Sequence, residues 1–146
     1  MPGGQHIEAL TRRAFERWNA RDYDRLLELF EEEATWDMTP IGVPGMHEFR
    51  GHAGIRRFFE EWLEAFPDSS VDVESVEERG DWGFATVIQR VHGGSSGVPA
   101  TFHYYGIGHW RSGRLTFVEN YVDGDLAWDA FRLYTEVLTP ERQPVG

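Results

Sequence analysis

The sequence predicts an α+β domain in which one curved, mostly antiparallel sheet wraps around helices as a cone and leaves a pocket inside. Two observations predict this architecture. Apolar residues recur at helical spacing in much of the chain up to residue 66, whereas nearly everything from 70 to 123 has the composition of strands. The last two predicted strands are also apolar on both sides, so both sides must be covered. Helices segregated from an antiparallel sheet define the α+β class.

Three helices are predicted before the run of strands. Apolar residues have helical spacing from His6 to Asn19, and Asp22 is suited to cap a second, short helix. The clearest helix ends at Pro67 and has arginine and glutamate on its wet face. Its apolar stripe consists of Ile55, Phe58, Phe59, Trp62, Leu63 and Phe66. We expect this stripe to lie in the core.

A short strand, Ala34–Thr39, is predicted between the second and third helices, followed by a loop rich in glycine and proline from 41 to 51. A last helix is expected after Asp125, which is suited to cap it. The remaining strands are expected at 71–76, at 82–92 and in a hairpin over 99–123 that turns at Arg111, Ser112 and Gly113. Because no repeat or long linker is visible, residues 1–146 are expected to form one domain.

Composition narrows the class of function. The net charge of -11 repels phosphate, which argues against nucleic acid and anionic membrane surfaces as partners. Without cysteine there is no disulfide framework, thiolate metal site or cysteine nucleophile. No apolar run is long enough to span a bilayer, and the N-terminal residues do not resemble a signal peptide. A cytoplasmic location is therefore expected.

Three segments carry a resemblance to a known family. These are RWNARDYDRLLELFEEEATW (17–36), FRGHAGIRRFFEEWLEAFPD (49–68) and SGRLTFVENYVDG (112–124). They resemble the SnoaL-like branch of the NTF2-like superfamily, which includes ketosteroid isomerases, polyketide cyclases, dehydratases and binding proteins. The resemblance implies a cone-shaped α+β fold, a homodimer and an apolar pocket that needs no metal or organic cofactor. One such fold supports many activities, so it does not name the reaction.

The isomerase residues themselves are not found at the matching positions. Met38 or Thr39 occupies the position of the catalytic base, and Ala14 and Gly106 occupy those of the oxyanion hole. The cyclase members use an acidic residue on the last strand, where Asn120 is expected to face inward. The sequence thus departs from both patterns.

Four residues are candidates for acid–base chemistry. Asp37 is a candidate base, but it is only a solvated strand residue if Trp36 and Met38 point inward. His92 is a candidate acid or base, or else lies in water at the rim. Tyr104 either faces the cavity or is an ordinary core tyrosine, and Asn120 is a candidate donor to a carbonyl. Candidate substrate-binding residues are Trp36, Met38, Phe84, Ile88, Arg90, Phe102, Val118 and Val122.

No metal site is predicted, since His103 and His109 lie about 20 Å apart on an extended strand. Two functions remain open. One is acid–base chemistry such as cyclisation, isomerisation or dehydration of a hydrophobic or aromatic small molecule. The other is a non-catalytic ligand-binding or dimerisation module. A homodimer is expected through the sheet face that carries Tyr105, Ile107, Phe117 and Tyr121.

Overall fold

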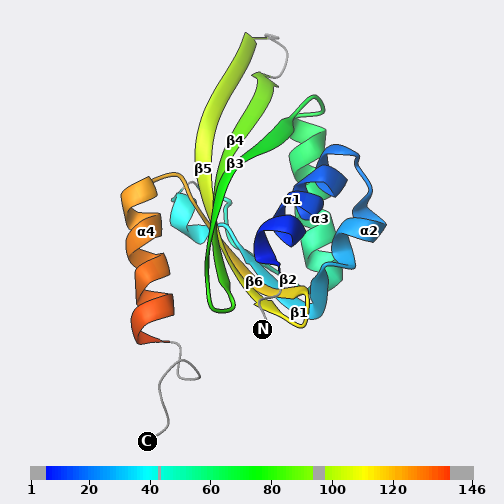
Figure 1. Cartoon of the computed structure of the whole chain (residues 1–146). Coiled ribbons are helices and arrows are strands. Elements are labelled where there is room, and N and C mark those ends of the chain that lie inside the picture. The colour runs from blue at the N-terminus through cyan, green and yellow to red at the C-terminus, as the bar shows by residue number, and fades with distance from the viewer. Residues whose placement is uncertain (1–5, 43, 94–97, 139–146) are drawn as a thin grey trace, which may run out of the picture.

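The computed structural model describes residues 6–42, 44–93 and 98–138. These residues form a curved six-stranded sheet with helices on both faces, as Figure 1 shows. Its strands lie in the order β2 (Glu48–Arg50), β1 (Phe30–Asp37), β6 (Arg114–Tyr121), β5 (Val98–Arg111), β4 (Trp82–Gly93) and β3 (Ser70–Arg79). All neighbours pair antiparallel except β1 and β6, which run parallel. The predicted α+β class and the mostly antiparallel, curved sheet are confirmed.

Helices α1 (Ile7–Asn19), α2 (Tyr23–Leu27) and α3 (Gly51–Ala65) lie on the concave face of the sheet (Figure 1). The opposite, convex face carries α4 (Gly124–Arg132), which continues into the π-helical turn η3 (Leu133–Val137). The sheet therefore separates two apolar clusters. The larger one lies under α1 and α3, and the smaller one lies under α4.

The third helix has the buried side that the sequence predicts. Its apolar residues Ile55, Phe58, Phe59 and Leu63 are buried, and the ring of Phe59 meets that of Trp18 of α1 edge-on at 4.7 Å between centroids. Asp22 caps α2 as predicted, because its side chain accepts a hydrogen bond from the backbone N–H of Arg25.

Several element boundaries differ from the predicted ones. β1 begins at Phe30 instead of Ala34, so the three glutamates 31–33 belong to the strand. β2 lies inside the segment predicted as a loop, where it pairs with the end of β1. Asp123, not Asp125, caps α4, because its carboxylate accepts from the backbone N–H groups of Asp125 and Leu126.

The register of β6 changes sides near its start. Trp110 pairs with Leu115 and His109 pairs with Phe117, which leaves one extra residue, Thr116, on β6. This bulge turns Leu115 to the concave core, whereas Phe117 packs on the convex side near Tyr134 at 6.1 Å between ring centroids. Leu115 and Phe117, two residues apart on β6, therefore lie on opposite faces of the sheet, although strict alternation along a strand predicts the same face for both.

The apolar patch expected to form a dimer interface is covered within the chain. Ile107 is fully buried, and Tyr105 and Tyr121 pack against the cluster under α4. The rings of Trp82 and Tyr134 stack at 4.7 Å, which joins η3 to the same face. The amphipathic α4 folds back over this patch, which the sequence analysis does not foresee, and the homodimer itself stays a prediction.

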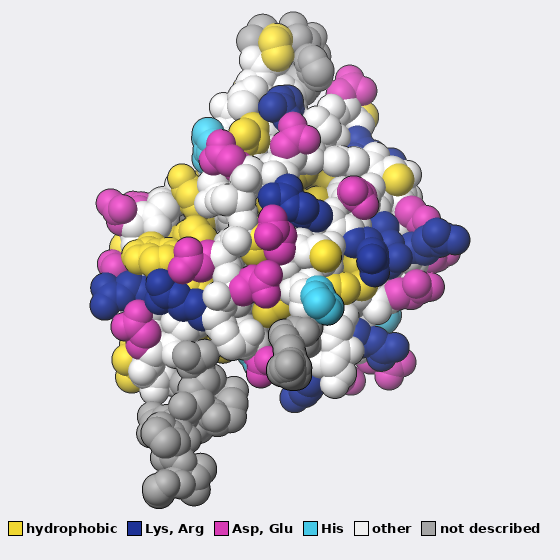
Figure 2. All heavy atoms as spheres, viewed as in Figure 1, with side chains coloured by type: hydrophobic (Ala, Val, Ile, Leu, Met, Phe, Trp, Pro, Cys, Tyr) yellow, Lys and Arg dark blue, Asp and Glu magenta, His cyan; other side chains and the backbone are white. Residues whose placement is uncertain are grey.

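The surface carries both signs of charge. Figure 2 shows acidic and basic side chains interspersed over the face seen there, with no continuous area of either sign. None of the helices in the described part of the chain combines the length and apolar character that a membrane span requires.

Candidate functional site

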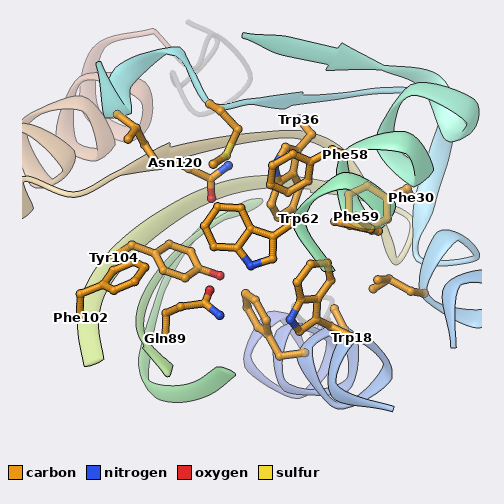
Figure 3. A pocket seen from close by; sticks show the side chains of 15 residues that line it. Trp18, Phe30, Trp36, Phe58, Phe59, Trp62, Gln89, Phe102, Tyr104 and Asn120 are labelled. Carbon is orange, nitrogen blue, oxygen red and sulfur yellow. The ribbon is translucent and has the colours of Figure 1, made fainter. Parts of the chain in front are cut away.

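A cavity lies between the concave face of the sheet and helices α1 and α3 (Figure 3). The space inside it that the centre of a water molecule can occupy is about 70 Å³. Aromatic side chains form most of the wall: Phe15, Trp18, Phe30, Trp36, Phe58, Phe59, Trp62, Phe102 and Tyr104. Ala14, Leu26, Met38, Ile41, Gln89 and Asn120 complete it. The space is suited to an apolar guest with flat rings.

The cavity wall carries no charge within the described residues. Its polar groups are the amides of Gln89 and Asn120, the hydroxyl of Tyr104 and indole N–H groups. In Figure 3 the polar ends of Gln89, Tyr104 and Asn120 converge on the space around Trp62. The described residues also include no cluster of three acidic, histidine or cysteine side chains that could hold a metal ion.

Asn120 is the most deeply buried of these polar residues, with 2% of its surface exposed. Its side-chain Nδ2 donates a hydrogen bond of 3.2 Å to the backbone oxygen of Asp37 on the neighbouring parallel strand. The amide oxygen is then directed into the cavity (Figure 3).

Tyr104 projects its hydroxyl from β5 into the cavity, where the described residues offer it no hydrogen-bond partner. Burial raises the pKa of Tyr104 far above its ordinary value, because the apolar wall disfavours the phenolate. The side chain therefore stays neutral at physiological pH and can donate a hydrogen bond. Gln89 on β4 is tied to the sheet by a long bond of 3.4 Å from its Nε2 to the backbone oxygen of Ser70.

Three tryptophans in the wall keep buried indole N–H groups without a partner among the described residues. They are Trp18, Trp36 and Trp62. Native proteins leave few buried donors unpaired, and each such donor costs about 1–3 kcal/mol of desolvation. Unpaired donors gathered around one apolar cavity are typical of a site that a guest completes.

The face of β4 differs from the predicted one. Gln89 lines the cavity, and Val87 and Ala85 lie on the same side of the strand in the concave core. Phe84 packs under α4 instead, at 5.4 Å from Phe131 between ring centroids. Ile88 shares the convex side, and Arg90 is exposed in an ion pair with Asp72. The lining assigned to Phe84, Ile88 and Arg90 is therefore wrong. Both sides of this strand are rich in apolar residues, so its pattern alone does not select a face.

Asp37 does not reach the cavity. Its neighbours Trp36 and Met38 line the wall, and its own carboxylate accepts bonds from the backbone N–H and the hydroxyl of Thr39, at 2.9 and 2.7 Å. The residue is 7% exposed and holds the turn η1 (Thr39–Ile41), which brings Ile41 to the cavity. The structure thus gives Asp37 a positioning role.

The remaining candidates lie in different surroundings. Phe102 lies in the wall, and 38% of its surface is exposed. Val118 is buried in the concave core without reaching the cavity, and Val122 is exposed beyond the end of β6. The backbone of His92 belongs to β4, but its side chain lies outside the described residues.

A second polar cluster, on the convex face, is absent from the sequence predictions. Glu119 is 9% exposed there and accepts hydrogen bonds from the hydroxyls of Tyr121 at 2.8 Å and Tyr134 at 3.1 Å. Its register partner on β1 is Asp37. We call Glu119, Tyr121 and Tyr134 the convex cluster. Sequence reasoning missed this cluster because Tyr134 belongs to the last helical segment, and the sequence pattern does not show where that segment packs on the sheet.

Comparison with known proteins identifies the family. A family model described as the SnoaL-like domain matches residues 11–118, most of the chain. The chain belongs to the SnoaL-like domain family. A comparison with curated proteins finds no significant match.

Solved structures resemble this SnoaL-like chain in fold. TerC, co-crystallised with polyporic acid, is 20% identical with a TM-score of 0.70, over 88% of this chain and 98% of its own. Bal32a, from a soil-derived mobile gene cassette, is 21% identical with a TM-score of 0.72, over 87% and 95%. An NTF2-like protein of unknown function from Burkholderia pseudomallei is 18% identical with a TM-score of 0.71, over 91% and 99%. At these identities the likeness shows the fold alone.

Proposed function

We propose that this protein binds a small, uncharged, largely aromatic molecule in the concave cavity. The observation that carries the proposal is the wall itself, which is aromatic and uncharged, with polar groups that have no partner among the described residues. Ring packing supplies most of the binding energy, and the few polar groups orient the guest. An ion would lose its hydration there without gaining a counter-charge from any described residue of the wall.

Two fold neighbours support a small-molecule site. TerC was co-crystallised with polyporic acid, and a protein from Catenulispora acidiphila with a ketosteroid isomerase-like fold was crystallised in complex with trimethylamine. The homodimer and the cytoplasmic location stay predictions.

A second candidate function is acid–base chemistry on the bound molecule, such as isomerisation, dehydration or cyclisation. Tyr104 favours it, because a neutral phenol in an apolar cavity can donate to a carbonyl oxygen that gains charge as an enolate forms. The described wall has no carboxylate or imidazole to act as the base, so binding without turnover is the simpler conclusion.

Binding is tested with the neutral fluorescent dye N-phenyl-1-naphthylamine. We expect one dye per chain and energy transfer from the wall tryptophans. Ala14→Phe places a ring in the cavity and should abolish binding, whereas Ala9→Phe on the exposed side of the same helix should leave it unchanged. Circular dichroism confirms that both variants fold. Equal binding by the two variants would contradict the proposal.

Turnover is tested with a ketone whose exchange needs only enolisation. The α-protons of 2-acetonaphthone are followed by NMR in D2O, with and without protein. Exchange that is accelerated by the wild type and lost in Tyr104→Phe supports the catalytic candidate. Exchange at the buffer rate, with the ketone bound, leaves the binding function alone.

A further inference from the structure

The amide of Asn120 has an orientation that the fold fixes. A backbone carbonyl can only accept a hydrogen bond, and the NH2 group is the only donor of the Asn120 side chain, so the contact with the Asp37 oxygen at 3.2 Å must come from Nδ2. The parallel pairing of β1 and β6 holds these two residues next to each other. The amide therefore cannot rotate to exchange its nitrogen and oxygen without losing this bond, and its oxygen stays directed into the cavity (Figure 3).

The space beside this oxygen is kept open by a glycine. Gly106 is the register partner of Asn120 on β5 and has no side chain to cover the amide. A Cβ atom added at Gly106 would lie 3.7 Å from Oδ1, which is an ordinary contact distance. The position thus accepts alanine without a clash, and the added methyl would occupy space beside the acceptor.

The acceptor has no donor among the described residues, although Asn120 is 2% exposed. An amide oxygen that faces an apolar cavity gains a hydrogen bond from a guest that supplies a donor, and this bond favours such a guest. A guest group that only accepts, such as an ether or a carboxylate, leaves Oδ1 unpaired or meets it with a like partial charge.

From this geometry we infer that Asn120 makes the cavity selective for guests that donate a hydrogen bond. The ligand class is a neutral aromatic molecule with a hydroxyl or an N–H group placed against Oδ1. The inference rests on the proposed binding function and adds a specificity-determining residue to it.

The test compares matched pairs of small aromatic probes, each pair differing in the donor. These are 2-naphthol with 2-methoxynaphthalene, for the hydroxyl, and indole with 1-methylindole, for the N–H. Each probe competes with N-phenyl-1-naphthylamine, and the ratio of dissociation constants within a pair measures donor preference. Because size and hydrophobicity cancel when this ratio is compared between variants, the change in ratio isolates the donor contribution.

Asn120→Leu has nearly the same shape and no acceptor, so donor preference should fall by about tenfold in at least one pair. Gly106→Ala keeps Asn120 and its bond to Asp37, and should lower the same ratio by a smaller factor. If Asn120→Leu does not fold, the ratio measured with Gly106→Ala alone tests the role of Asn120. Ala9→Phe on the surface serves as the control and should keep the wild-type ratio.

The outcomes separate the two proposals. If both pairs keep their wild-type ratios in every variant that folds, the role of Asn120 is wrong while the binding function stands. If the wild type does not bind the dye or any of the four probes, the binding function is wrong and the role of Asn120 is wrong with it. Loss of preference in the hydroxyl pair alone, or in the N–H pair alone, supports the role and identifies the donor.

Discussion

Two adjacent residues of β6, Glu119 and Asn120, place polar groups on opposite faces of the sheet, and these two groups differ in their hydrogen bonds. Glu119 faces the convex side, where the hydroxyls of Tyr121 and Tyr134 donate to its carboxylate at 2.8 and 3.1 Å. Asn120 faces the concave side, where its amide oxygen has no partner among the described residues. At these two positions the convex face pairs its polar group within the protein and the concave face leaves it open. The pairing on the convex side is not complete, because the buried indole N–H of Trp82 has no partner among the described residues.

This difference shows how a fold with two aromatic clusters distinguishes core from site. The convex cluster is a closed set, because η3 brings Tyr134 to the carboxylate and stacks it on Trp82. On the concave side the hydroxyl of Tyr104 and the indole N–H of Trp62 remain unpaired within the described residues. Burying such groups without partners is unfavourable for stability, so their presence is expected where a ligand supplies the partners.

The largest expected effect on stability is at the centre of the aromatic wall on the concave side. Phe59 is buried at the centre of the aromatic wall, so Phe59→Ala should lower the free energy of unfolding by about 3–5 kcal/mol. Phe102→Ala, at a partly exposed site in the same wall, should cost less than about 1 kcal/mol. Chemical denaturation measures both. If both variants lost the same free energy of unfolding, the wall would not have a tightly packed centre at Phe59 and a looser rim at Phe102.

A pair of glycines gives the next effect. A Cβ at Gly83 would lie 2.7 Å from Cγ2 of the fully buried Ile7, so Gly83→Ala should lower stability by about 1–3 kcal/mol. Gly106→Ala meets nothing closer than 3.7 Å and should be within about 0.5 kcal/mol of the wild type. Thermal and urea unfolding report both. A neutral Gly83→Ala would show that α1 does not pack on β4 as closely as described.

Much of the fold follows from patterns that a sequence displays directly. The spacing of Phe58, Phe59 and Leu63 predicts the buried side of α3, and the predicted strands from 70 to 123 match β3 to β6 closely. The short β2 could not be predicted, since three residues in a loop rich in glycine and proline gain their order only from pairing with β1.

The site was harder to predict than the fold. Which side chains of a strand face the cavity depends on the elements that cover each face of the sheet. In β5 the small residues Gly106 and Gly108 beside Tyr104 indicate the cavity side, and Tyr104 does line the cavity. In β4 both Phe84 and Val87 suit an apolar face, so the pattern could not show that α4 covers the former. The packing of α4 against the sheet depends on contacts between distant parts of the chain, so no local sequence pattern predicts it.

High pH should weaken the protein mainly through tyrosines on both faces. Burial, with the charge of Glu119 and the hydrogen bond to it, raises the pKa of Tyr134 to about 12. Tyrosine in an unfolded chain titrates near pH 10, so the unfolded state ionises first. The stability that Tyr134 contributes is therefore fully present below about pH 10 and is lost as pH rises toward about 12.

Unfolding measured from about pH 9 to about pH 11.5 should show this loss in the wild type, and Tyr134→Phe should show less of it. Glu119→Gln removes the negative charge beside the hydroxyl and should lower the pKa of Tyr134. An unchanged alkaline loss in Tyr134→Phe would show that this hydroxyl is not buried against the carboxylate.

The same substitution on the two faces tests the central claim most directly. Tyr134→Phe breaks bonds to Glu119 and should lower the free energy of unfolding by about 1–2 kcal/mol while leaving 2-acetonaphthone binding unchanged. Tyr104→Phe breaks no bond within the described residues, so stability should stay within about 0.5 kcal/mol of the wild type while the ketone binds about tenfold more weakly. Both quantities come from urea unfolding followed with and without saturating ketone. If Tyr104→Phe instead lost stability and kept its affinity, the concave cavity would be an ordinary core and the assignment of the ligand site would be wrong.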